Sequence, residues 1–414
     1  MTIRGRSRLP LAILVAVAAA GAATFLLRPR SGLIEPAAVD VEAYFTAFQL
    51  ERAEDFRGVQ RVLGIGGLVA STATLALLTW RPPRRIFDRL GRRPVIGGAA
   101  AGVGLSLLLV VVELPLSAVG HERAVDVGLS TQQWLPWLGD VAKSSAIDAL
   151  FAGAGGALAI ALIRHFRRNW WAPAAGVIVA FGVITIWLFP VVIDPVFNRF
   201  EPLRPGPTRD DVVELAEEAG VDVGEVYRVD ASRRTTAANA YVGGLGRTKR
   251  VVLYDNLISA FPRDQVRLVV AHELAHQKHN DLRRGLLWLA LVAPAGTFLA
   301  QALAERLARR HGLGDPRRPP GPIVLPALAL SIAIVSFGLG AGSNVLSRAV
   351  EARADAFSLR LTDDPAAFVQ LERRLALRNV SDPDPPALLH TLFGTHPTTV
   401  ERIGIGEAFN LAGG

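Results

Sequence analysis

The residues from Val270 to His276 read Val-Ala-His-Glu-Leu-Ala-His, which places two histidines four positions apart and a glutamate beside the first. Positions i and i+4 lie on the same face of a helix, so the imidazoles of His272 and His276 can bind one metal ion. Glu273 lies beside them, where a carboxylate can act on a metal-bound water as a general base. The pattern therefore predicts a hydrolytic zinc site formed by these three residues.

A hydrolytic zinc ion needs a third protein ligand and keeps its fourth position for water. The metzincin pattern requires Gly and His at fixed later positions, but these hold His279 and Leu282 here. The gluzincin pattern instead takes a glutamate from a second helix. Glu351 fits that role, and Asp355, one helical turn later, can hold the free ring N–H of a ligating histidine, for which we expect His272. Glu351 on its own is also consistent with a solvated helix face.

The composition indicates a membrane protein, because 50% of the 414 residues are hydrophobic and the mean hydropathy is +0.32. Seven apolar segments are long enough to span a bilayer: 9–27, 62–80, 95–119, 146–163, 171–193, 285–304 and 321–346. The first could also be a signal peptide, but its length and the lack of a clear cleavage site favour a retained anchor. In the third, Gly98-x-x-x-Gly102 indicates close helix packing.

These segments predict a predominantly α-helical, polytopic membrane protein with about seven transmembrane helices and a small α+β gluzincin zinc domain. Two crossings, segments six and seven, separate His272 and His276 from Glu351, so all three ligands emerge on the same face of the membrane. We expect four parts along the chain: five transmembrane helices with their loops in 1–193, a small sheet and the zinc helix in 194–284, two further transmembrane helices in 285–346, and a helical segment that completes the zinc site in 347–414.

Residues 194–284 carry the signals of a small mixed fold. Thr208 and Asp211 fit a capping box for a helix that ends near Gly220. Pro262 opens the zinc helix, and three short β-rich runs precede it, at 225–229, 238–242 and 250–254. A sheet beside that helix suggests an edge strand, which can bind an extended peptide through main-chain hydrogen bonds. The same strands are equally consistent with a small core that binds nothing.

Four motifs occur in a fixed order along the chain: Asn239-Ala240-Tyr241 before the strand 251–255, the zinc-helix motif, Ser347-Arg348 leading to Glu351 and Asp355, and Thr395-His396-Pro397 followed by Arg402. With these motifs the chain resembles the integral-membrane CAAX prenyl endopeptidases, a gluzincin family with seven spans, over nearly its whole length. The resemblance implies a ring of helices around a large intramembrane chamber, capped by the zinc domain. Arginine far outnumbers lysine, and Ala, Gly and Pro are abundant, which is typical of a GC-rich genome and indicates a bacterial-type member.

The resemblance implies a zinc-dependent endopeptidase with one Zn²⁺ per chain, which cleaves membrane-associated or CAAX-like peptides. Glu273 then activates the attacking water, His396 donates a hydrogen bond to the oxyanion, and Arg402 supports the same region. Asn239 and Tyr241 are expected to contact the substrate backbone. His396 alone also fits a surface His-Pro turn. The partners implied are peptide or protein substrates, lipidated or membrane-associated, together with membrane lipids.

Two other functions fit parts of the pattern. A metal transporter, or another metal-binding membrane protein without proteolytic activity, would explain seven spans and a His/Glu cluster. Transport ligands usually lie within spans near the membrane midplane, however, whereas these ligands flank the spans. An inactive relative that acts as a scaffold would not need the full set of catalytic residues found here. The absence of cysteine excludes thiolate ligands, and the following histidines lack partners at ligand spacing: His121, His165, His311 and His390.

The formal net charge of +8 does not indicate a nucleic-acid partner, because the arginines cluster at the ends of apolar segments. Six of them lie in one loop: Arg81, Arg84, Arg85, Arg89, Arg92 and Arg93. Such a loop is typical of the cytoplasmic side of the cell membrane, where it meets anionic lipids. If this loop is cytoplasmic, counting the predicted spans along the chain places the zinc domain on the outer face. The family resemblance places it in the cytosol. The sequence alone leaves the facing open.

Overall fold

The computed structural model describes residues 8–243, 250–313 and 320–413. Within these ranges, seven helices are long and apolar enough to cross a membrane, which confirms the predicted number of spans. They are α1 (Arg8–Leu27), α2 (Ala47–Trp80), α4 (Pro94–Asp126), α5 (Trp134–Phe166), α6 (Trp171–Leu188), α11 (Asp281–Arg310) and α12 (Leu325–Thr362). A π-helical turn, Phe189–Ile193, continues α6 into the short α7 (Asp194–Phe197). The short apolar segment 146–163 lies within the 33-residue α5.

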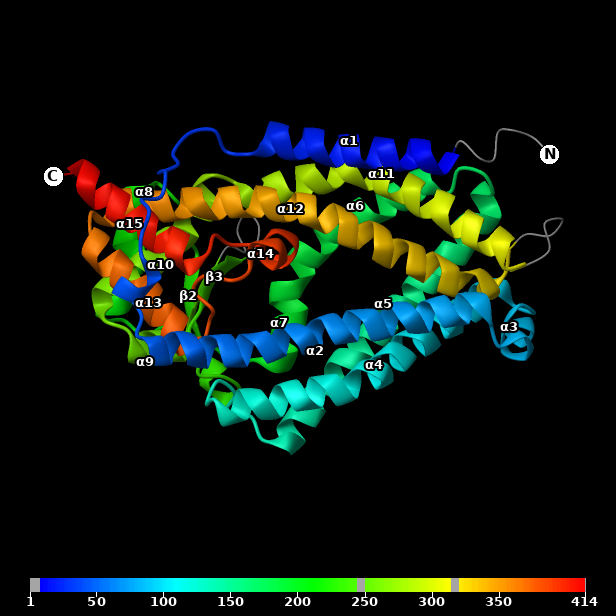
Figure 1. Ribbon diagram of the computed structural model, residues 1–414, viewed down its shortest axis with the longest axis horizontal. Coiled ribbons are helices and arrows are strands. Elements are labelled where there is room, and N and C mark those ends of the chain that lie inside the picture. The colour runs from blue at the N-terminus through cyan, green and yellow to red at the C-terminus, as the bar shows by residue number, and fades with distance from the viewer. Residues whose placement is uncertain (1–7, 244–249, 314–319, 414) are drawn as a thin grey trace.

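The long helices run between two ends of the molecule that differ in content (Figure 1). One end holds the sheet and four of the shorter helices, α8 (Pro207–Ala219), α10 (Arg263–Lys278), α13 (Pro365–Arg378) and α15 (Thr399–Gly413). The other end holds α3 (Arg84–Leu90), where Phe87 packs with side chains from the end of α5 and the beginning of α12. A helical membrane bundle that carries a small α+β unit confirms the predicted fold class.

Helices α4 and α5 approach closely along a face of small residues. A Cβ added at Gly102 would lie 2.1 Å from the carbonyl oxygen of Ala152, and one added at Gly156 would lie 2.3 Å from the carbonyl oxygen of Gly98. Neither position accepts a larger side chain unless the helices separate. The predicted packing role of Gly98 and Gly102 is confirmed.

The sheet has four strands in the order β1-β2-β4-β3. β2 (Glu225–Val229) and β4 (Arg250–Tyr254) coincide with predicted runs, and β3 (Ala240–Gly243) overlaps the remaining one. β2 pairs parallel with β4, and β3 pairs antiparallel with β4. β1 (Phe200–Pro202) was not predicted, because three residues that end in proline carry no alternating pattern. β3 lies at one edge of the sheet and thereby provides an edge strand of the kind that was expected.

The core of the small α+β unit lies between the sheet and the helices around it. Buried side chains from β4, α8, α10, α13 and α15 form this core, among them Leu253, Leu215, Leu274, Phe368 and Ile405. The short α9 (Asp255–Ala260) links β4 to α10, and Pro262 is the N-cap of α10, which confirms the predicted start of the zinc helix.

The capping box expected at Thr208 is wrong. α8 begins at Pro207, with Gly206 at its N-cap and no capping hydrogen bond from a side chain. Asp211 is instead buried, where its Oδ2 accepts from Nε of Arg263 at 2.6 Å and its Oδ1 pairs with Arg267. Its carboxylate thereby fastens α8 to α10, the helix that carries the two histidines.

Candidate metal centre and active-site cleft

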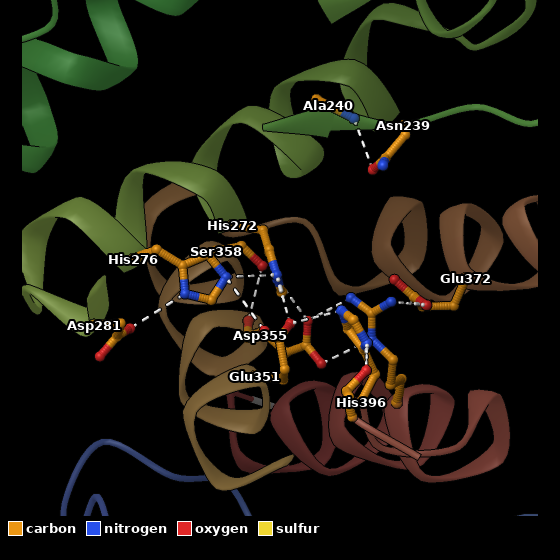
Figure 2. Close-up of polar contacts among 12 residues, drawn as sticks. Asn239, Ala240, His272, His276, Asp281, Glu351, Asp355, Ser358, Glu372 and His396 are labelled. Atoms are coloured by element: carbon orange, nitrogen blue, oxygen red, sulfur yellow. Dashed lines mark hydrogen bonds and ion pairs between the residues drawn. The ribbon is translucent and has the colours of Figure 1, made fainter. Parts of the chain in front are cut away.

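Two helices bring the three predicted metal ligands together (Figure 2). α10 contributes His272 and His276, and α12 contributes Glu351 after α11 and α12 have returned the chain to the same end of the molecule. One ligand atom from each residue lies within 4.8 Å of the others. The two Nε2 atoms are 3.3 Å apart, and Oε2 of Glu351 lies 3.2 Å from Nε2 of His272.

The hydrogen bonds of the two imidazoles favour a cation between them. Nδ1 of His272 lies 2.8 Å from Oδ1 of Asp355, and Nδ1 of His276 lies 3.2 Å from Oδ2 of Asp281. Ionised carboxylates only accept hydrogen bonds, so each Nδ1 carries a proton, and Nε2 is the ring atom that a neutral imidazole offers to a metal ion. These two Nε2 atoms and the carboxylate oxygen lie close enough together to bind one cation. Two imidazoles and one carboxylate are a donor set that fits Zn²⁺.

Asp355 is fully buried and connects His272 to Arg402 of α15. Nε of Arg402 donates to one Asp355 oxygen at 2.9 Å and Nη2 donates to the other at 2.6 Å, while Nη1 lies 2.7 Å from Oε2 of Glu372. Burial opposes the charge of Arg402, but Asp355 and Glu372 outweigh it and raise the pKa of this guanidinium. Burial also raises the pKa of Glu372 to about 7. The structure thus places Asp355 beside His272, as expected, and brings Arg402 to the site through Asp355.

A second carboxylate, Asp281, holds His276 in the same way. It lies in the first turn of α11, directly after Asn280, whose left-handed backbone (φ 54°) turns the chain back. Arg353 donates to Asp281, and Nε of Arg284 lies 3.4 Å from the same oxygen. The sequence pattern did not predict the contact between Asp281 and His276. The two side chains meet only because the chain turns at Asn280.

Glu273 lies next to the edge strand β3, where the backbone N–H of Val242 donates to its carboxylate. Burial raises the pKa of Glu273, and the neighbouring His272 and His276 only partly oppose this shift. A carboxylate whose charged form is destabilised in this way accepts a proton more readily than a solvated one. Its surroundings therefore suit the predicted role of general base.

A cavity of about 600 Å³ opens beside the metal centre. Its lining includes Asn239, Glu273 and residues 394–399. His396 belongs to this last segment, and its Nε2 lies 3.3 Å from Oε2 of Glu351 (Figure 2). The ring of His396 therefore reaches Glu351, one of the predicted metal ligands, in addition to lying in a His-Pro turn.

Of the two residues predicted to contact substrate, the structure brings only Asn239 to this cavity. Oδ1 of Asn239 accepts from the N–H of Ala240 at 2.9 Å (Figure 2). The Tyr241 hydroxyl donates to Oδ2 of Asp194 in α7 at 2.6 Å and thereby fastens β3 to the end of a membrane helix. The substrate contact expected for Tyr241 has no support in this geometry.

Residues 203–405 match the model of peptidase family M48, and residues 66–199 match that of the CAAX prenyl protease N-terminal region, described as five membrane helices. The chain is 32% identical over 313 residues to the metalloprotease YhfN of Bacillus subtilis, in a match that covers 73% of this chain and 71% of the relative. It is 25% identical over 324 residues to CAAX prenyl protease 1 of Saccharomyces cerevisiae, which covers 72% of this chain and 69% of that protein. The fold is similar to the crystal structure of S. mikatae Ste24p, with a TM-score of 0.75, 20% identity and coverage of 96% of this chain and 98% of that chain.

Replacing Asp281 with asparagine should weaken zinc binding by about 10- to 100-fold, because His276 loses the charged partner that orients its ring. Zinc affinity is measured in detergent solution by competition with a chromophoric chelator. Asp264→Asn is the matched control, since Asp264 is an acid in the first turn of α10 that accepts from the backbone N–H of Gln265. Equal zinc affinities of the Asp281 and Asp264 variants would rule out this role of Asp281.

Proposed function

The chain belongs to peptidase family M48, and we propose that it hydrolyses peptide bonds with one zinc ion bound by His272, His276 and Glu351. It is a multi-span membrane metalloprotease. The observation that carries the proposal is the convergence of two imidazole nitrogens and a carboxylate oxygen beside Glu273, at the wall of a cleft. A transporter is not favoured, because the family is one of peptidases and the proposed ligands lie within the residues that match it.

Zinc, when bound, supplies a Lewis acid that polarises the scissile carbonyl and acidifies a water molecule. Glu273 accepts the proton of the attacking water and passes it to the leaving amine, which suits its raised pKa. His396 donates a hydrogen bond from its ring to the oxyanion that develops on the substrate carbonyl. Arg402 holds Asp355 in its charged form, and Asp355 in turn orients the ring of His272.

The edge strand β3 supports the binding of an extended peptide. Its pairing with β4 uses one side of its backbone, and the N–H of Val242 reaches Glu273. A substrate strand can therefore add main-chain hydrogen bonds at this edge, with its scissile bond next to Glu273. Asn239, at the cavity wall just before β3, is proposed to contact the substrate backbone. Tyr241 is proposed to hold β3 in place through Asp194.

The proposed substrates are membrane-associated or CAAX-like peptides, lipidated peptides among them. The relative from Saccharomyces cerevisiae is named a CAAX prenyl protease. A second cavity of about 580 Å³ adjoins the cleft and shares part of its lining: Pro385, His390, Phe393 and Gly394. The rest of its lining is mostly apolar: Arg61, Gly64, Ile65, Leu68, Phe337 and Leu389. Such a cavity provides space for an apolar chain next to the peptide bond that is cleaved.

The distribution of arginines supports an outer-face position for the zinc domain. α3, the end of α5 and the end of α11 pack together at the end of the molecule opposite the sheet (Figure 1). Arginines crowd this basic end: Arg81, Arg84, Arg85, Arg89, Arg92, Arg93, Arg167, Arg168, Arg306, Arg309 and Arg310. Positively charged loops usually remain in the cytoplasm, where they meet anionic lipid headgroups. The basic end is therefore proposed to be cytoplasmic, with the active site on the outer face.

Replacing Glu273 with glutamine should lower kcat by a factor of about 100 to 10,000 while zinc stays bound, because the amide keeps the shape but cannot take a proton. Zinc-loaded protein is incubated with matched prenylated and unprenylated peptides, and the products are read by mass spectrometry. Glu218→Gln, an exposed change on α8, should cleave like the unaltered protein. Undiminished cleavage by the Glu273→Gln protein would refute proteolysis at this site. A preference for prenylated peptides would support the lipidated class of substrate.

The chain contains no cysteine, so single introduced cysteines report the facing directly. Asp88 in α3 and Asp222 after α8 are both exposed. In intact cells, a membrane-impermeant maleimide should label the Asp222→Cys protein at once and the Asp88→Cys protein only after the membrane has been permeabilised. The reverse pattern would place the zinc domain in the cytosol, as the family resemblance implies.

A further inference from the structure

One face of α12 carries four polar residues that all contact the active site or the turn beside it. Asn344, Arg348, Glu351 and Asp355 are separated by four, three and four positions, so they form a single stripe along the helix. Glu351 and Asp355 belong to the metal centre. Asn344 and Arg348, on the preceding turns, point to the short helix α14 (Ala387–Phe393) and have no part in the chemistry described above.

These two side chains hold the end of α14. Nδ2 of Asn344 donates to the carbonyl of Leu392 at 2.7 Å, and Nη1 of Arg348 donates to the carbonyls of Gly394 at 2.7 Å and His390 at 3.3 Å. The last carbonyl groups of a helix have no partners within the helix, so they need donors from elsewhere. Here the donors come from the same helix that supplies the metal ligand Glu351.

The turn that follows α14 is tightly packed around glycine. A Cβ added at Gly394 would lie 2.3 Å from Cδ2 of His390, so a larger residue would displace the histidine ring. That ring donates from Nε2 to the carbonyl of His396 at 2.9 Å, because a carbonyl can only accept. His390, which its spacing in the sequence had set aside, therefore joins the beginning of the turn to its end.

The position of the His396 ring depends on this turn. The side chain of His396 is 59% exposed, so packing around the ring does little to fix it. Its backbone is held through His390, and the turn before it is held by Arg348. Arg348 and Glu351 lie one turn apart on α12, so the separation between the His396 ring and the metal ligand is set by one rigid helix.

We propose that Arg348, assisted by Asn344 and His390, is a positioning residue that places His396 over the metal centre for the hydrolytic step. This inference rests on the proposed function, in which His396 stabilises the oxyanion. Arg348 is absent from the lining of the cleft, so it acts on the reaction through His396 and does not contact the substrate there. A misplaced donor loses much of its effect, because oxyanion stabilisation requires hydrogen-bond distance and direction.

The test is a double-mutant cycle on kcat with a peptide that the unaltered protein cleaves. His396→Ala should lower kcat by about 100- to 1,000-fold, as for the loss of one oxyanion donor. Arg348→Met should lower kcat by up to about 100-fold while KM and bound zinc stay close to those of the unaltered protein. Because both changes act on the same step, the double variant should be no slower than His396→Ala alone.

Two further variants separate positioning from general damage. Arg360→Met is the matched control, since Arg360 lies on the same helix and donates to the carbonyl of Gly32, away from α14. It should leave kcat unchanged. Asn344→Leu removes only the hydrogen bond to the carbonyl of Leu392. If the Arg348→Met protein does not fold, Asn344→Leu replaces it in the double-mutant cycle with His396→Ala.

The outcomes distinguish the inference from the function on which it rests. Losses of kcat that multiply in the double variant, or loss of zinc on Arg348→Met, would overturn the positioning role alone. An unchanged kcat for His396→Ala would overturn the oxyanion role of His396, and the inference with it. No cleavage by the unaltered zinc-loaded protein would count against the proposed function as a whole.

Discussion

Two carboxylates, each paired with an arginine, determine how the two histidines of the proposed zinc site are oriented. On one side, Asp355 orients His272 and is held by Arg402. On the other side, Asp281 orients the second histidine and is held by Arg353. A buried carboxylate without a partner is costly, so each arginine stabilises the charged carboxylate that orients its histidine. These partners come from α11, α12 and α15, so the geometry of the proposed metal centre depends on the packing of these helices.

Helix α12 joins this arrangement to the membrane. It has 38 residues, and at about 1.5 Å per residue it is roughly 57 Å long, well beyond the roughly 30 Å of a hydrocarbon core. Its first half runs among the membrane helices, and its last turns reach the end of the molecule that holds the sheet (Figure 1). Glu351 and Asp355 lie in the last third of this helix. One continuous element thus joins the membrane-spanning part of the molecule to the proposed metal centre.

The features that could be predicted from the sequence are those that local patterns determine. Apolar segments of membrane length form their own helices, and the i, i+4 spacing of His272 and His276 holds on any helix. Glu351 could be grouped with these histidines because two spans separate it from them in the sequence. Two spans return the chain to the same side of the membrane. The features that were missed arise where the chain folds back on itself. Asp281 meets a histidine only because of the turn at Asn280, and Tyr241 lies against α7 only because α6 ends beside the sheet.

X-ray absorption spectroscopy at the zinc edge tests the metal centre most directly. For the purified protein we expect one zinc ion per chain, with two imidazole nitrogens at about 2.0–2.1 Å and a carboxylate oxygen at about 2.0–2.2 Å. The His276→Ala protein should show one imidazole fewer. A zinc ion surrounded by oxygen atoms only, or an imidazole count that stays the same in the His276→Ala protein, would contradict the assignment of His272, His276 and Glu351 as the ligands.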